Sequence, residues 1–392
     1  MTVWLTSTSA VDAQQIAQSE KQMADVSFNH QKALDWLSLN PSAYPLLVTT
    51  LSIDGTKVFV MLDTGSRYSV IDTSTARKVG MGPEPSGKTA TISGDIDLSR
   101  AGYKLLEIGG FRHRGGSIFV ADLGELRKRS GHAIEAIIGA DLLGWVALEV
   151  DWDDNRMRLL QHAQAPSVGS RIPITFDAKT GQIITRLSIN GLDVHRVEID
   201  TGRDGAITLD RVLKAQIPEL PGDVTDIAVH GLNGDTVLED YFRVRDVGFG
   251  ALHYADVPIS VGVVRPPGFP PADALIGMDF LRQFNFVLDP PSGYITVLPR
   301  SQSAPKPQTT TSGIQGLYAS EGLVVHHVML NSPAQKAGLK DGDRVCAVDG
   351  ERVDASWEHS AKRAWSVGEP GTVVTLTLCD NTHISFKLTR FY

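Results

Sequence analysis

Short runs that alternate hydrophobic and polar residues fill most of the first three hundred positions, and Gly, Pro and Asn interrupt them. Residues 46–62 and 183–199 show the pattern most clearly. Successive side chains of a strand point to opposite faces, so a period of two predicts antiparallel strands with one buried face. This region is therefore expected to be mainly β.

Residues 12–37 follow a different pattern, with hydrophobic positions at helical spacing and a stop at Pro41. They predict an N-terminal helical segment, residues 1–45, that docks on the β-rich region. An alternative is a removable inhibitory pro-segment, in which Lys21 or Lys32 reaches acidic groups in a cleft.

The β-rich region contains an internal repeat. Residues 53–65 return as 189–202, and the segment Ile137-Ile138-Gly139 returns as Leu275-Ile276-Gly277 at nearly the same offset of about 137 residues. Two homologous lobes follow, which we assign to residues 46–162 and 163–299.

Composition changes after the second lobe. Residues 300–312 are rich in Ser, Gln, Thr, Pro and Lys, which is typical of an extended linker. Residues 313–392 are long enough to fold as a small separate domain.

Charge and cysteine content exclude several classes of function. The net charge of −8 argues against a nucleic-acid partner, which selects a basic surface. Cys346 and Cys379 are too few for a disulfide framework or a four-thiolate zinc site. No run approaches the roughly 20 apolar residues of a membrane span. We expect no integral membrane segment, no metal and no organic cofactor.

The repeat places one Asp at the end of a strand in each half, Asp63 and Asp200. Two adjacent carboxylates that share a proton provide both the base that activates water and the acid that protonates the departing nitrogen of a peptide bond. The motifs Asp63-Thr64-Gly65-Ser66 and Asp200-Thr201-Gly202, each followed by a hydrophobic-hydrophobic-Gly segment, resemble those of the pepsin and retropepsin superfamily over residues 46–299.

That resemblance implies a bilobal acid-protease β-barrel fold. It also implies catalytic roles for Asp63 and Asp200, cross-bracing of the two loops by Thr64 and Thr201, and supporting roles for the remaining loop residues, Gly65, Ser66 and Gly202. The structural alternative is a duplicated barrel in which the aspartates only cap turns.

Two features depart from the family pattern. Arg203 stands where a small residue usually follows the Gly. If its guanidinium lay near the two aspartates, it would favour their ionised form. If it were turned outward, it would contact substrate or solvent. No Tyr occurs in residues 90–98, where a pepsin-like flap has one. The flap is instead expected to resemble retroviral proteases, with tips at Ile92, Ser93, Gly94, Gly231, Asn233 and Gly234, although ordinary hairpin turns are an alternative.

Residues 82–89 match the phosphate-loop expression G-x-x-x-x-G-K-[ST], but the context is wrong. The stretch contains two prolines and leads into a predicted strand, whereas a phosphate loop opens a helix. We interpret it as the entry to the first flap.

The C-terminal segment resembles bacterial PDZ domains through residues 322–328, 331–343 and 345–350. Ser332 is predicted to cap a short helix that has Pro333 at its first position and ends at Gly338. The resemblance implies a small α+β domain that binds an extended peptide or a chain terminus. Its carboxylate-binding loop is expected at Gly316, Leu317, Tyr318 and Ala319, and a helix near residues 356–366 is expected to form the opposite wall.

The sequence thus predicts an aspartic endopeptidase that acts on peptide or protein substrates, with a possible C-terminal peptide ligand of the PDZ-like domain. Proteases joined to such domains often act outside the bacterial cytoplasm, so the resemblance implies a periplasmic or secreted location. The alternatives are a peptide-binding scaffold disabled by Arg203, and a self-processing or single-substrate regulator.

Overall fold

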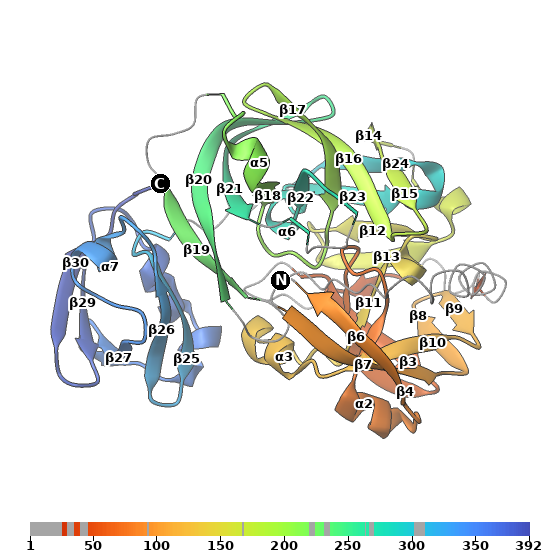
Figure 1. Cartoon of the computed structure of the whole chain (residues 1–392), viewed down its shortest axis with the longest axis horizontal. Coiled ribbons are helices and arrows are strands. Elements are labelled where there is room, and N and C mark those ends of the chain that lie inside the picture. Colours follow the sequence, from red (N-terminus) through yellow and green to blue (C-terminus); the bar gives the residue numbers. More distant parts are fainter. Residues whose placement is uncertain are drawn as a thin grey trace.

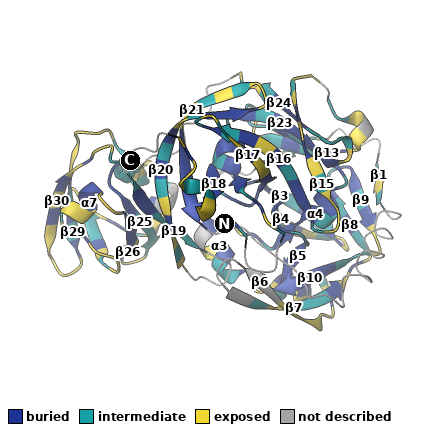
Figure 2. Ribbon diagram, turned by 45° about the horizontal axis from the view of Figure 1, so that its top comes forward, coloured by how far each residue is buried: buried dark blue, intermediate teal, exposed yellow. Residues whose placement is uncertain are grey.

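The computed structural model describes residues 26–29, 35–39, 46–91, 94–166, 168–218, 224–230, 236–262, 264–265, 270–301 and 310–392. Two β-rich lobes face one another, and a smaller C-terminal unit lies beside the second lobe (Figure 1). One hydrophobic core runs through both lobes, and a separate core fills the C-terminal unit. Figure 2 shows buried residues along the strands inside each part.

The first lobe is built on a ten-stranded sheet with the order β1-β9-β8-β3-β4-β11-β5-β10-β7-β6. Asp72 caps its helix α2 by accepting hydrogen bonds from the backbone of Ser74 and Thr75, and Gly80 ends that helix with a φ of 83°. The elements of this lobe are β1 (Val26–Phe28), β3 (Val48–Ile53), β4 (Thr56–Leu62), β5 (Val70–Asp72), α2 (Thr73–Val79), β6 (Glu84–Thr91), β7 (Gly94–Gly102), β8 (Leu105–Ile108), β9 (Phe111–Arg114), β10 (Ser117–Ala121), α3 (Gly124–Ser130), β11 (Ala136–Ile138) and α4 (Ala140–Leu143).

The second lobe repeats this arrangement in an eight-stranded sheet with the order β15-β16-β17-β22-β18-β21-β20-β19. In the first lobe the short strand β11 lies parallel to β4, which leads to Asp63, and antiparallel to β5. In the second lobe the short strand β22 lies parallel to β17, which leads to Asp200, and antiparallel to β18. The elements are β15 (Thr175–Asp177), β16 (Gln182–Ile189), β17 (Leu192–Ile199), β18 (Ile207–Asp210), α5 (Arg211–Lys214), β19 (Thr225–His230), β20 (Thr236–Phe249), β21 (Leu252–Gly262), β22 (Ala274–Ile276) and α6 (Met278–Leu281).

A six-stranded sheet joins the lobes, because β12 of the first half pairs with β23 of the second. Its order is β14-β24-β23-β12-β13-β2. The elements are β2 (Leu37–Ser38), β12 (Ala147–Asp151), β13 (Arg156–Leu160), η1 (His162–Gln164), β14 (Ser170–Pro173), β23 (Phe284–Asp289), η2 (Pro290–Ser292) and β24 (Tyr294–Pro299). The chain is therefore mainly β and bilobal, as the repeat predicted.

The predicted helix over residues 12–37 is wrong where that segment is described. Val26–Phe28 forms β1, which pairs with β9, and Leu37–Ser38 forms β2, which pairs with β13. Pairing with open sheet edges overrides the local helical spacing, because packing outweighs intrinsic propensity. Residues 12–25 and 30–34 lie outside the described part of the chain.

The C-terminal unit is a sheet with the order β25-β26-β27-β29-β30, and β28 pairs with β27. As predicted, Ser332 caps the short helix α7 by accepting from the backbone N–H of Gln335, and Pro333 is its first residue. The elements are β25 (Ile314–Ala319), β26 (Gly322–Val328), α7 (Pro333–Lys336), β27 (Arg344–Val348), β28 (Glu351–Arg352), η3 (Ala355–His359), η4 (Ala361–Val367), β29 (Val373–Leu378) and β30 (His383–Lys387). No described helix of the chain is long and apolar enough to cross a membrane.

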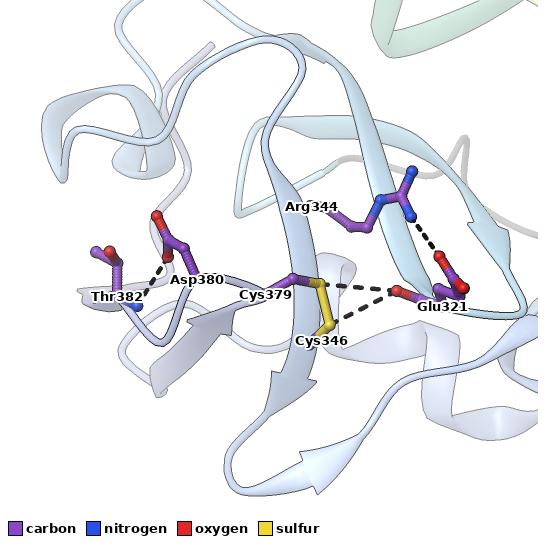
Figure 3. Close-up of a disulfide and its surroundings, with 6 residues drawn as sticks. All are labelled: Glu321, Arg344, Cys346, Cys379, Asp380 and Thr382. Carbon is purple, nitrogen blue, oxygen red and sulfur yellow. Dashed lines mark hydrogen bonds and ion pairs between the residues drawn. A yellow bond between two sulfur atoms is a disulfide. The ribbon is translucent and has the colours of Figure 1, made fainter.

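The two cysteines form a disulfide, which the sequence analysis did not anticipate. Cys346 on β27 is bonded to Cys379, just after β29, and both sulfurs lie 3.6 to 3.7 Å from the carbonyl oxygen of Glu321 (Figure 3). The pairing arises because the two strands are neighbours in the sheet.

Reduction of this disulfide is expected to lower the free energy of unfolding of the C-terminal unit by about 3–4 kcal/mol, because the bond closes a loop with a sequence separation of 33. Hydrogen exchange of β29 in the full chain, with and without reductant, measures the change. A Cys346→Ser/Cys379→Ser chain is the control and should not respond to reductant. Unchanged protection after verified reduction would contradict the expectation.

Candidate active site

Each lobe places an Asp directly after a buried strand. Asp63 follows β4 and Asp200 follows β17, and both residues are fully buried. The backbone N–H of Asp63 donates to the carbonyl oxygen of Ile138 at 2.9 Å, and that of Asp200 donates to Ile276 at 2.9 Å. The repeated segments β11 and β22 therefore hold the two aspartates in equivalent positions.

Two threonines tie the aspartate loops to each other. The Thr64 hydroxyl donates to the carbonyl of Ile199 at 2.7 Å and accepts from the N–H of Thr201 at 3.1 Å. Reciprocally, the Thr201 hydroxyl donates to the carbonyl of Leu62 at 2.8 Å and accepts from the N–H of Thr64 at 3.0 Å. These four buried hydrogen bonds form a two-fold brace between the lobes.

Removing one hydroxyl of this brace should be strongly destabilising. Thr64→Val keeps the shape of the side chain but leaves the Ile199 carbonyl and the Thr201 N–H buried without partners, at about 1–3 kcal/mol each. We expect the free energy of unfolding, measured with urea, to fall by about 2–6 kcal/mol. Thr56→Val, at a half-buried position of β4, is the matched control, with an expected change within about 0.5 kcal/mol. Equal changes in the two variants would refute the role of the brace.

The two loops approach so closely that only glycine fits at their tips. A Cβ atom on Gly65 would lie 2.3 Å from Oδ1 of Asp200, and one on Gly202 would lie 2.3 Å from Cγ and Oδ1 of Asp63. The N–H groups of Gly65 and Ser66 donate to Oδ1 of Asp63 at 2.9 and 3.0 Å, and that of Gly202 donates to Oδ1 of Asp200 at 2.9 Å. Each carboxylate thus faces the glycine of the opposite loop.

Burial raises the pKa of Asp63 well above its usual range, and the negative charge of Asp200 raises it further. The N–H of Ser66 opposes this shift. Within the described part of the chain, no donor satisfies Oδ2 of Asp63. Two buried carboxyl groups in such contact favour a state in which one of them is protonated.

Arg203 neither points to solvent nor pairs with an aspartate of the dyad. Its guanidinium is almost fully buried and donates to Oε2 of Glu239 at 2.9 Å and to Oγ of Ser260 at 3.4 Å. Burial opposes its charge, but Glu239 and the neighbouring aspartates raise the pKa of the guanidinium. The positive charge is therefore largely compensated, and the residue links the second aspartate loop to β20.

A second buried ion pair near the dyad was missed from the sequence. Glu198, two residues before Asp200 on β17, is fully buried and contacts the guanidinium of Arg265. Burial raises the pKa of Glu198 to about 8, although the charge of Arg265 opposes the shift. The sequence did contain a signal for this ion pair, because Glu198 places a charged side chain at an inward-facing position of β17. The equivalent position of the first lobe is the apolar Met61.

The expected flaps correspond to two hairpins, β6–β7 and β19–β20. Gly94 is the first residue of β7. The other expected tip residues lie outside the described residues, namely Ile92, Ser93, Gly231, Asn233 and Gly234. Residues 82–89 lead into and form β6 rather than opening a helix, in line with their interpretation as the entry to the first hairpin.

Gly316, Leu317, Tyr318 and Ala319 do not form a loop. They belong to β25, which pairs with β26, so the prediction of a carboxylate-binding loop there is wrong. Backbone pairing with β26 continues to Ala319, and the turn to β26 comes only afterwards. The helix expected near 356–366 is likewise replaced by η3 and η4, because Ser360 ends the first and caps the second.

Comparisons with known proteins found similarities to two family models and to solved structures. Residues 49–142 match the family model described as aspartyl protease, and residues 300–385 match the model described as PDZ domain. No curated protein matches the chain. Among solved structures, a retropepsin-like aspartic protease from Rickettsia conorii matches with 18% identity and a TM-score of 0.26, covering 33% of this chain and 89% of its own.

Residues 49–142 are thus similar to aspartyl proteases, and residues 300–385 are similar to PDZ domains. The PDZ domain is a module for peptide recognition.

Proposed function

We propose that the chain is an aspartic endopeptidase in which Asp63 and Asp200 form the catalytic dyad. The reciprocal contact of the two loops carries this proposal, since each carboxylate lies against the glycine of the opposite loop. A duplicated barrel whose aspartates only capped turns would not need two buried carboxylates held face to face. Their desolvation is tolerable if they share a proton and act on a substrate together.

The raised pKa of Asp63 suits the member of the dyad that holds the shared proton. The ionised partner takes a proton from water, whose oxygen attacks the carbonyl carbon, while the protonated carboxyl group gives its proton to the carbonyl oxygen. Collapse of the resulting gem-diol breaks the C–N bond as the nitrogen receives a proton, and the dyad returns to its singly protonated state. Thr64, Thr201, Gly65, Gly202 and Ser66 hold the loops in this geometry.

The surroundings of Arg203 favour an active enzyme over a disabled scaffold. Because Glu239 compensates its charge, Arg203 does not hold both aspartates ionised.

We propose that the PDZ domain supplies peptide recognition. The disulfide supports a periplasmic or secreted location, since such bonds persist in oxidising compartments.

Incubation of the full chain with a mixed peptide library between about pH 3 and 8, followed by mass spectrometry of the products, tests the function. Activity requires one shared proton, so it should fall at low pH when both carboxyls are protonated and at higher pH when both ionise. Because the pKa of Asp63 is raised, the second loss should lie well above 3.8, the usual pKa of an Asp side chain. Absence of cleavage at every pH would refute the proposal.

A further inference from the structure

The two aspartates of the dyad have unequal surroundings. In the first lobe, Met61 stands two residues before Asp63, is fully buried and packs in an apolar cluster. In the second lobe the equivalent position is Glu198, whose side chain is 1% exposed and contacts the guanidinium of Arg265. The duplicated fold thus places a charged pair beside one aspartate and an apolar side chain beside the other.

Strand geometry directs Glu198 to the side of β17 from which Asp200 projects. Successive side chains of a strand point to opposite faces. Val197 and Ile199 belong to the hydrophobic core of the lobes, so Glu198 lies on the opposite face. Asp200 follows two residues later and continues that face. The Glu198–Arg265 pair and the second aspartate therefore share one side of the strand.

Packing fixes Arg265 in this place. Its side chain is 7% exposed, and the preceding residue, Val264, is fully buried in a small apolar cluster with Leu275 of β22. Leu275 pairs in register with Glu198, and the residue after it accepts a hydrogen bond from the backbone N–H of Asp200 at 2.9 Å. Arg265 is therefore anchored on the strand that also positions the second aspartate.

The guanidinium of Arg265 interacts electrostatically with the whole dyad. Burial lowers the pKa of Arg265, and the charge of Glu198 opposes this shift. The negative charges of Asp200 and Asp63 oppose it as well. Because an interaction between charges is mutual, the guanidinium in turn favours an ionised carboxyl group in the dyad.

Glu198 leaves this positive charge to the dyad at acidic pH. Burial raises the pKa of Glu198 to about 8, the charge of Arg265 opposes the shift, and the charge of Asp200 adds to it. Below that pH Glu198 mostly holds a proton, so it contacts the guanidinium without neutralising it. The charge of Arg265 then balances the single negative charge of a dyad that shares one proton.

The other charged groups beside the second aspartate compensate one another. Arg203 is paired with Glu239 at 2.9 Å, and Asp204 adds a second negative charge next to the same guanidinium. Arg203 is thus matched by its own acidic neighbours, whereas Arg265 has a partner that is protonated below pH 8.

We propose that Arg265 is a positioning residue of the dyad, which keeps Asp200 as the ionised member and leaves the shared proton on Asp63. Glu198 holds the guanidinium in place for this role. The raised pKa of Asp63 supports the same division. The catalytic meaning of the division rests on the proposed protease function, but the ionisation of the two carboxyl groups can be measured without cleavage.

The ionisation is measured by NMR on the full chain, with aspartate labelled with ¹³C at its side-chain carboxyl and a titration from about pH 3 to 8. Loss of a signal in Asp63→Asn or Asp200→Asn assigns the two resonances. In the wild type Asp200 should ionise before Asp63. In Arg265→Met the midpoint of this first ionisation should rise by at least about 0.5 pH unit, the size expected for loss of a unit charge near a buried carboxyl group.

Two further variants separate charge from structure. Arg265→Lys keeps the positive charge and should titrate within about 0.2 pH unit of the wild type. Arg158→Met is the matched control, because it removes the guanidinium of another ion pair, with Glu149, between β12 and β13. It should leave both aspartate signals unchanged. If Arg265→Met fails to fold, Glu198→Gln/Arg265→Met removes both partners, leaves no unpaired carboxyl group, and should show the same upward shift.

The pH profile of cleavage provides a second readout. The acid limit of activity of Arg265→Met should move upward together with the first ionisation, because the dyad needs one ionised carboxyl group. A purely structural defect would lower activity at every pH and leave the acid limit where it is.

The outcomes distinguish the role of Arg265 from the proposed function. Ionisation of Asp63 before Asp200, an unchanged midpoint in Arg265→Met, or an equal shift in Arg265→Lys or Arg158→Met would overturn the role of Arg265, and cleavage by the wild type would still support the protease. An upward shift in Arg265→Met alone, in a chain whose wild type cleaves no peptide, would support the role of Arg265 in ionisation and refute the protease.

Discussion

Replacing either Asp63 or Asp200 by Asn is expected to lower kcat/KM for peptide cleavage by at least about 10⁴-fold, because the amide can neither take a proton from water nor share one with its partner. The two variants should be equally inactive, since each removes half of a single functional unit. Cleavage of a peptide identified in the library, followed by mass spectrometry, measures the effect. Asp193→Asn, an exposed substitution on β17, the strand that leads to Asp200, is the matched control and should keep wild-type activity.

Stability provides a second readout for the same pair. A carboxyl group whose folded pKa is raised stabilises the protein at low pH, and this contribution is lost as the pH rises from the unfolded value through the folded pKa. The pKa of Asp63 is raised by burial and by Asp200. Asp63→Asn should therefore gain stability relative to the wild type as the pH rises above about 4. Cleavage that survives in either Asn variant would refute the assignment of the dyad. An Asn variant that is stable but inactive would show that the loss of cleavage is not caused by misfolding.

The second large effect is expected from a single methyl group on either loop glycine. Gly65→Ala and Gly202→Ala each place a Cβ atom 2.3 Å from atoms of the opposite carboxylate, so that loop or carboxylate must move. Displacement of reacting groups by about 1 Å reduces activity by about 10²-fold, which we expect as the minimum loss of kcat/KM. Overpacking should also lower the free energy of unfolding by about 1–3 kcal/mol.

Gly82→Ala is the matched control for these variants. No atom lies within 4 Å of a Cβ built on Gly82, and none of the three glycines has a positive φ, so only the steric contact differs. The control should keep wild-type kcat/KM and stability in the same cleavage and urea experiments. If Gly65→Ala and Gly202→Ala behaved like the control, the close approach of the loops would not be required for activity.

Several features of the molecule were readable from the sequence because they are local or repeated. Alternating polarity predicted the strands, and the recurrence of the Asp-Thr-Gly segments predicted two lobes with equivalent aspartates. The cap of α7 at Ser332 was also local, since the hydroxyl contacts the backbone three residues later. In each case the relevant interaction spans a few residues or is repeated in register.

Other expectations failed because distant partners decided them. Val26–Phe28 and Leu37–Ser38 became strands through pairing with β9 and β13. The carboxylate-binding loop expected within β25 was absent because backbone pairing with β26 extends through those residues.

The sequence by itself determined the two-fold repeat, the identity of the paired aspartates and the presence of a C-terminal PDZ-like domain, because motifs and periodicity are properties of short segments. The tertiary structure decided that Arg203 pairs with Glu239, that Cys346 pairs with Cys379, and that the PDZ edge faces β19. These pairings join residues 33 to 87 positions apart. Nothing in the local pattern encodes such partners, because they are selected by how complete sheets pack against one another.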